Sequence, residues 1–162
     1  MAKFFAEYWF QGWLKDYLKI LTHEEHPHIT LTSPFHIISS KEQVQELIVS
    51  LCKKYKPIPF TLEGKAKFEE TMYVPIVNCR ELKRFYSDLE LALINHVIFV
   101  EKLNPTKILY VNAGKKEIKY FKRQDLIVNQ ITFLKDKKLW FVYDFETKKV
   151  LTRKQELLEY SF

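Results

Sequence analysis

The sequence predicts an α+β fold in a single domain, with one mixed sheet and flanking helices. Three observations support this prediction. The chain has 162 residues and a hydrophobic content of 47%, and segments with the two-residue period of strands alternate along it with segments that have helical periodicity. A chain of this length buries roughly two thirds of its unfolded surface, so it can form a core. Residues 1–162 are therefore expected to form one domain, since no linker-like stretch divides them.

Composition excludes several classes of protein. Gly12, Gly64 and Gly114 are the only glycines, and a phosphate loop needs two or three within eight residues. Cys52 and Cys79 are too few for a disulfide framework and do not form a CxxC motif. No apolar run reaches the ~20 residues of a membrane span, so a cytoplasmic protein without membrane contact is expected. The net charge of +6, from 26 basic and 20 acidic residues, permits nucleic-acid binding without demanding it.

The first part of the chain alternates strands and helices. Residues 3–10 are predicted as a strand, 13–21 as a helix and 28–31 as a strand. Ser40 and Gln43 then have the spacing of a capping box, which predicts a second helix that ends before the next proline.

The remaining elements follow the same rules. Two antiparallel strands are expected near residues 60–66 and 72–77, and Asn78 with Glu81 is expected to cap a third helix. The later predictions are a strand at 96–100, one or two short helices after 105, a hairpin of 126–134 with 139–145, and a last helix at 153–162.

Three histidines lie in the segment HEEHPHITL, and three interpretations of them are open. The first is a solvated loop, and the second is a metal site, although no HExxH spacing accompanies the imidazoles. The third starts from alternation: His28, Thr30 and Thr32 share one face of a strand. An imidazole beside hydroxyls can hold a phosphate oxygen and transfer a proton near neutral pH.

Acid–base chemistry on a phosphate needs a second proton-transfer group, because one histidine cannot be acid and base at once. His96 opens another short apolar strand, and each of the two strands follows a predicted helix. The sequence therefore pairs His28 with His96 as candidate catalytic residues.

The stretch PHITLTSPF, residues 27–35, resembles the first HxT/S motif of the two-histidine (2H) phosphoesterases. That superfamily comprises 2′-5′ RNA ligase-like and cyclic phosphodiesterase proteins. The resemblance extends to the order of strands and helices. It implies a fold of two pseudo-symmetric halves, in which mixed or antiparallel strands form a central cleft flanked by helices. By this resemblance, His28 and Thr30 match the first motif.

The second motif departs from the family pattern. His96 occupies the expected place, but Ile98 stands where the family has Thr or Ser, and an isoleucine donates no hydrogen bond to phosphate. An alternative placement at residues 130–132, Gln-Ile-Thr, keeps the threonine and lacks the histidine. It fits the final hairpin better, so His96 is preferred.

The resemblance implies a metal-independent hydrolase without cofactors. His28 and His96 would act as acid and base on 2′,3′-cyclic phosphodiesters, while Thr30 binds the substrate. Tyr73 is added as a substrate-binding residue, because it begins a strand beside the expected cleft. The expected partner is a nucleotide or an RNA with a 2′,3′-cyclic phosphate end, and no obligate protein partner is inferred.

A second function class remains open, namely a catalytically impaired RNA- or nucleotide-binding module that retains the fold. It is suggested by Ile98 and by the basic block at residues 115–123, where Tyr120 and Phe121 lie among cations. The competing interpretation of this block is a solvated basic face with both rings in the core.

Overall fold

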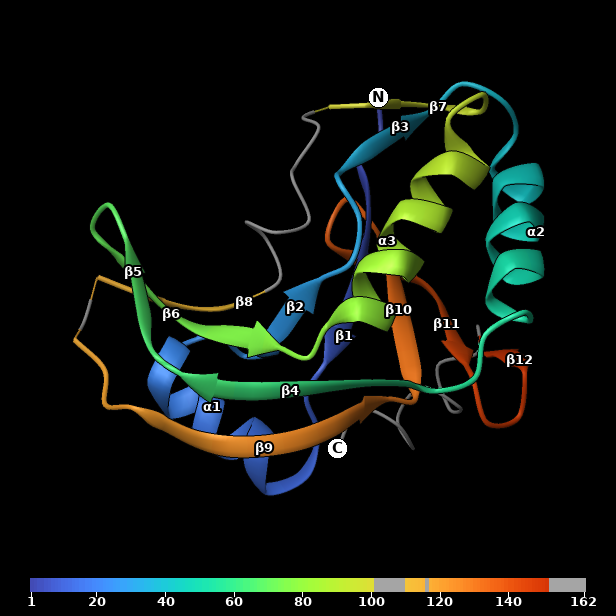
Figure 1. Cartoon of the computed structure of the whole chain (residues 1–162). Helices are drawn as coiled ribbons and strands as arrows, with labels where there is room; N and C mark the ends of the chain where they lie inside the picture. The colour runs from blue at the N-terminus through green and yellow to red at the C-terminus, as the bar shows by residue number, and fades with distance from the viewer. Residues whose placement is uncertain (101–109, 116, 152–162) are drawn as a thin grey trace.

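The structure is a computed structural model that describes residues 1–100, 110–115 and 117–151. Within these residues, three helices pack against two antiparallel sheets (Figure 1). The α+β prediction is confirmed, but the single mixed sheet is wrong. The segment predicted as one strand at 126–134 is divided: β9 (Phe121–Val128) joins one sheet and β10 (Gln130–Lys135) joins the other.

The first sheet, which we call sheet A, is built around β1. Its described strands run in the order β12-β11-β10-β1-β3-β7, and β2 pairs with β1 on the same side as β3. Besides β10, they are β1 (Phe4–Trp9), β2 (His28–Thr30), β3 (Phe35–Ile37), β7 (Val97–Phe99), β11 (Lys138–Asp144) and β12 (Lys149–Leu151). The short strands β2 and β3 therefore follow one another along one edge of β1.

The second sheet, sheet B, is built around β4 and β6. Its strands are β4 (Ile58–Gly64), β5 (Ala66–Phe68), β6 (Thr71–Val77), β8 (Tyr110–Gly114) and β9. The two antiparallel strands predicted from alternation are confirmed as β4 and β6. The short helices expected after residue 105 are not confirmed. Residues 105–109 lie outside the described chain, and the described residues that follow form the strands β8 and β9.

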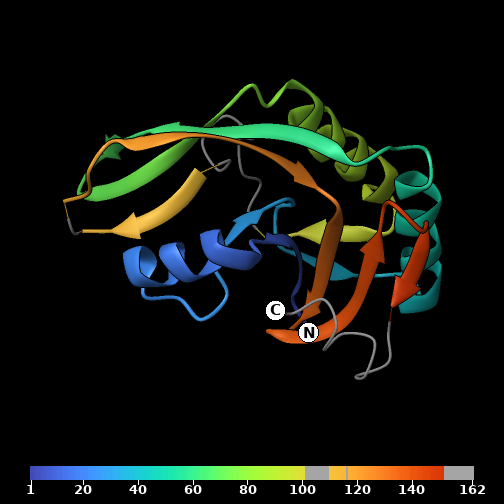
Figure 2. The same cartoon turned by 90° about the horizontal axis from the view of Figure 1, so that it is seen from below.

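The three helices are α1 (Gly12–Thr22), α2 (Lys41–Cys52) and α3 (Arg80–Leu93). Helix α1 packs against sheet B, where the rings of Tyr17 and Phe121 lie 5.9 Å apart (Figure 2). Helices α2 and α3 pack together at the other end of the molecule, and Phe85 of α3 contacts Phe145, just after β11. Each sheet is thus covered by a helical layer on its apolar face.

The predicted caps are right for α2 and wrong for α3. The Ser40 hydroxyl accepts a hydrogen bond from the Gln43 backbone N–H at 3.0 Å, as a capping box requires. Helix α3 instead begins after Cys79, which makes no side-chain cap. Asn78 lies one residue before this N-cap and adopts a positive φ of 50°.

The final hairpin is confirmed as β10 and β11. Asp136 and Lys137 form its turn, both with positive φ, which matches the twist of the paired strands. The helix predicted at 153–162 lies outside the described residues. Among the described helices, none has the length and apolar character needed to cross a bilayer.

Removing the hydroxyl group is expected to change the stability of the protein differently at two buried tyrosines. The Tyr86 hydroxyl bonds to the Ser33 hydroxyl at 2.7 Å, whereas the buried Tyr143 hydroxyl has no hydrogen-bond partner among the described residues. Tyr86→Phe should lower the free energy of unfolding by about 1 kcal/mol, while Tyr143→Phe should leave it unchanged or raise it by up to ~1 kcal/mol. Urea unfolding of both variants checks this, and a larger loss for Tyr143→Phe would contradict it.

Candidate functional site

The antiparallel register of β1 and β2 gathers four side chains on one face of sheet A. His28 lies opposite Trp9, and Thr30 lies opposite Glu7. Ile29, between them, is fully buried on the other face. Because residues alternate along a strand and opposed residues share a face, Glu7, Trp9, His28 and Thr30 lie together, each of them half-buried.

His28 is held on both sides of its ring. Its Nε2 atom lies 3.1 Å from a carboxylate oxygen of Glu7. Its Nδ1 atom lies 2.9 Å from the backbone carbonyl oxygen of His26 and 3.3 Å from a carboxylate oxygen of Glu24. A neutral imidazole has one N–H and donates to one side, whereas an imidazolium donates to both. The surroundings therefore orient the ring.

Trp9 extends this cluster toward the loop before β2. Its indole N–H donates to Glu7 at 3.0 Å, and its ring stacks on His26 with centroids 4.2 Å apart. Burial lowers the pKa of His26, and the nearby positive charge of Lys15 lowers it further. The stacked pair thus presents an aromatic surface next to His28.

Glu7, Glu24 and His26 contact His28, and the sequence analysis assigned none of them to the catalytic site. The sequence does contain a feature that points to Glu7, because it is the acidic residue in the aromatic segment FFAEYWF of the first strand. Its meaning depends on the partner strand, because only the pairing of β1 with β2 places this carboxylate beside His28.

His96 lies toward the other end of β1 from His28. It precedes β7, which pairs with β3, and β3 pairs Phe35 with Phe4 of β1. His28 pairs with Trp9, five residues further along β1 (9 − 4 = 5), a span of roughly 17 Å at ~3.3 Å per residue. His96 lies beyond that point, at the far end of β7. The structure therefore does not bring together the two histidines that the sequence analysis pairs.

The alternative motif placement at residues 130–132 lies in β10, next to β1. Thr132 is opposite Glu7 and so shares the face that carries Thr30. Thr132 is buried, at 5% exposure. The two threonines thus lie on either side of Glu7, in β2 and β10.

The edge strands of the two sheets, β2 and β8, lie side by side (Figure 1). We call residues 28–30 and 110–114 the β2–β8 junction. Tyr73, predicted to bind substrate, is half-buried in β6 and lies opposite Asn112 of β8. The structure thus places His28, Thr30 and Tyr73 in the strands around this junction.

The basic block at residues 115–123 combines the two interpretations that the sequence left open. Phe121 is buried and contacts Tyr17, as the core interpretation expects. Tyr120 is 63% exposed, as a stacking surface requires. Within the described part of the block, Tyr120 is therefore the ring that a ligand can reach.

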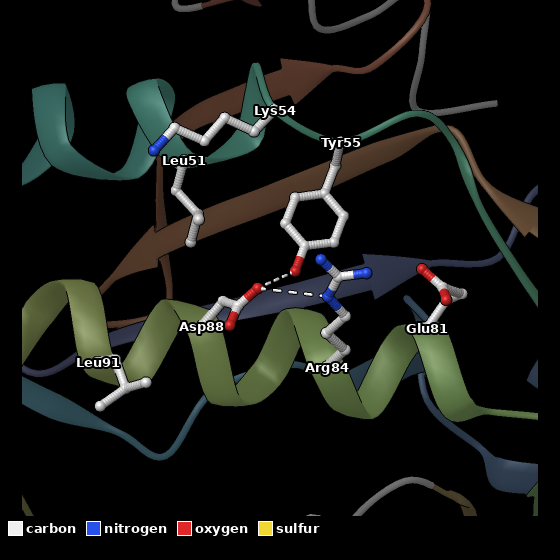
Figure 3. Close-up of a pocket in the computed structure, with 7 residues that line it drawn as sticks. All are labelled: Leu51, Lys54, Tyr55, Glu81, Arg84, Asp88 and Leu91. Atoms are coloured by element: carbon white, nitrogen blue, oxygen red, sulfur yellow. Dashed lines mark hydrogen bonds and ion pairs between the residues drawn. The ribbon is translucent and has the colours of Figure 1, made fainter.

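A separate pocket of about 380 Å³ lies between α2 and α3 (Figure 3). The Tyr55 hydroxyl donates a hydrogen bond to Asp88, and Arg84 Nε lies 3.9 Å from the same carboxylate. Burial, together with the bond to Asp88, raises the pKa of Tyr55 above its ordinary range. The lining residues are Leu51, Lys54, Tyr55, Glu81, Arg84, Asp88 and Leu91, and none of them is a predicted site residue.

The metal interpretation of the HEEHPHITL segment gains no support from the geometry. His23 terminates α1 in the left-handed conformation, with φ 59°. The part of the chain that the structure describes contains no group of three His, Cys, Asp or Glu side chains arranged to hold a metal ion.

Comparison with known proteins gives one match. A family model described as the 2′-5′ RNA ligase superfamily matches residues 5–99, more than half of the chain. The match includes the strands that carry Glu7, His28 and Thr30. No curated protein matches the chain.

The stack of Trp9 on His26 predicts a measurable titration. His26 should lose its proton at a midpoint below pH 6.5, because burial and Lys15 both disfavour its cation. Lys15→Gln should raise the midpoint by removing the second cause. NMR titration of the imidazole signals, with His26 assigned by His26→Gln, measures this. A midpoint at or above 6.5 in the unmodified protein would contradict the buried stack.

Proposed function

The chain belongs to the 2′-5′ RNA ligase superfamily, and from this premise we propose that it acts on phosphodiester ends of nucleotides or RNA at the β2–β8 junction. The proposed reaction is hydrolysis of a 2′,3′-cyclic phosphate without a metal ion. The single observation that carries the proposal is the placement of His28 and Thr30 on one face of β2, with Glu7 against the imidazole.

The chemistry assigned to His28 is proton transfer. As general acid, the imidazolium gives the Nε2 proton that faces Glu7 to the ribose oxygen, which leaves phosphorus when water opens the ring. The proton that the attacking water loses passes to solvent, from which the neutral imidazole is protonated again. The backbone carbonyl of His26, which meets Nδ1, fixes the plane of the ring, and the carboxylate of Glu7 lies beside Nε2. Thr30 lies two residues after His28 on the same face of β2, and it donates its hydroxyl hydrogen to a phosphate oxygen.

A second candidate function is ligand binding without efficient turnover. The observation that favours it is the separation of His28 from His96 by more than the roughly 17 Å of β1 between Phe4 and Trp9. A phosphate held by His28 and Thr30 then has one acid–base histidine, whereas the resemblance to the 2H phosphoesterases implies two. Such a protein would bind the phosphate end and hydrolyse it slowly.

Hydrolysis of a 2′,3′-cyclic-phosphate RNA oligonucleotide in EDTA tests the proposal. We expect His28→Ala to lower kcat/KM by about a hundred- to ten-thousandfold, because it removes the proton-transfer group. His96→Ala is the matched control, since it removes a half-buried histidine beyond the far end of β1. It should leave kcat/KM unchanged.

Three other outcomes have definite meanings. Equal losses in both variants would restore His96 as a second catalyst and contradict a site that contains His28 without His96. Binding of the oligonucleotide without hydrolysis would select the binding module. A protein that neither binds nor hydrolyses the oligonucleotide would overturn the proposed function.

A further inference from the structure

The ring of Tyr120 lies next to a glycine at the end of a strand of sheet B. Gly64 is the last residue of β4, and its φ of 96° is positive. A Cβ atom at residue 64 would lie 3.6 Å from Cε2 of Tyr120 and 3.8 Å from Cγ of Pro75. The ring and Pro75 therefore border the same space beside Gly64, while Tyr120 as a whole stays 63% exposed.

Pro75 shows which face of sheet B the ring borders. Its neighbours Val74 and Ile76 are buried in the core, so Pro75 lies on the opposite face of β6. Tyr73, two residues earlier in β6, shares that face with Pro75 and lies opposite Asn112 of β8. Because β8 lies beside β2, one stretch of sheet surface leads from the candidate site to the Tyr120 ring (Figure 1).

The distance along this surface exceeds one strand spacing. The strands β8, β6 and β4 are successive neighbours in sheet B. Paired strands lie about 4.8 Å apart, so two spacings place Gly64 of β4 roughly 10 Å from β8, and β2 lies beyond β8. A phosphate end held at His28 thus leaves its own nucleotide near β8, and the Tyr120 ring is placed for a base further along the strand.

Two lysines next to Tyr120 supply positive charge. Lys119 and Lys122 are exposed, and within the described residues neither makes an ion pair. Lys115 and Arg123 of the same basic block instead lie beside carboxylates, at 3.8 Å and 3.3 Å. An exposed ring flanked by cations is the combination by which proteins bind single-stranded nucleic acid, since the ring stacks on a base and the cations meet phosphates.

We propose that Tyr120, Lys119 and Lys122 form a binding surface for the nucleotides that precede the phosphate end of a single-stranded RNA. Tyr120 stacks on a base, and the two lysines contact backbone phosphates. This inference rests on the proposed function, and it assigns an RNA strand rather than a mononucleotide to the site. The three side chains bind the strand and take no part in proton transfer.

Calorimetric binding of two ligands tests the role of Tyr120. The first ligand is a single-stranded RNA hexanucleotide that ends in a 2′-phosphate, and the second is adenosine 2′-monophosphate. Tyr120→Ala should weaken hexanucleotide binding by about fivefold to a hundredfold, because it removes one stacked base, and it should leave monophosphate binding unchanged. Tyr120→Phe keeps the ring and should keep the hexanucleotide affinity within about twofold.

The salt dependence of hexanucleotide binding tests the two lysines. Lys119→Gln combined with Lys122→Gln removes two phosphate contacts, so the slope of log K against log salt concentration should become shallower by about 1.4, at about 0.7 per phosphate. The matched control is Lys135→Gln combined with Lys138→Gln, which removes the same charge from exposed lysines at the end of the β10–β11 hairpin. It should leave the slope unchanged, and an equal change of slope in both double variants would contradict the assignment of the lysines.

Trp13→Ala is the control for loss of an exposed ring, because Trp13 of α1 is 64% exposed, and it should leave both affinities unchanged. Urea unfolding verifies that each variant is folded. Equal affinity of the unmodified protein for both ligands, or an unchanged hexanucleotide affinity in Tyr120→Ala, would overturn this inference and leave the proposed function intact. Unchanged affinity for both ligands in His28→Ala and in Thr30→Val, or no binding by the unmodified protein, would overturn the proposed function itself.

Discussion

The antiparallel register between β1 and β2 determines which side chains meet at the candidate site. It places His28 opposite Trp9 and Thr30 opposite Glu7, with Ile29 on the buried face. A slip of one residue would turn the imidazole and the hydroxyl into the core and expose the isoleucine. Burial of the apolar face of sheet A therefore fixes the polar face as well, and the contacts of His28 with Glu7 and Glu24 follow from it.

Much of this arrangement could be predicted from the sequence, because it depends on local alternation. The HIT segment was recognisable as a half-buried strand, and the resemblance of PHITLTSPF to the first 2H motif agrees with the match to the 2′-5′ RNA ligase superfamily. The division into two sheets was not predictable in this way. Asn129 alone separates β9 from β10, so the change of sheet is invisible in a continuous apolar pattern.

The position of β8 beside β2 could not be predicted from the sequence, for a different reason. His96 heads the first apolar strand after α3, so order along the chain makes it resemble the counterpart of His28. Strand pairing shows instead that β7 extends sheet A beyond β3, while β8 pairs with β6 in sheet B and lies beside β2. Only long-range pairing distinguishes the two strands, and a single sequence carries no direct record of it. The result is a junction with His28 and Thr30 on β2 and with β8 of the other sheet beside them.

In the proposed function, the phosphate group binds beside His28 and away from His96. Its most direct test is an NMR titration of histidine-labelled protein with adenosine 2′-monophosphate, with signals assigned from His28→Ala and His96→Ala. We expect the His28 imidazole signals to shift and saturate with the nucleotide while the His96 signals stay in place. Saturable shifts of His96 with an unmoved His28 would contradict it.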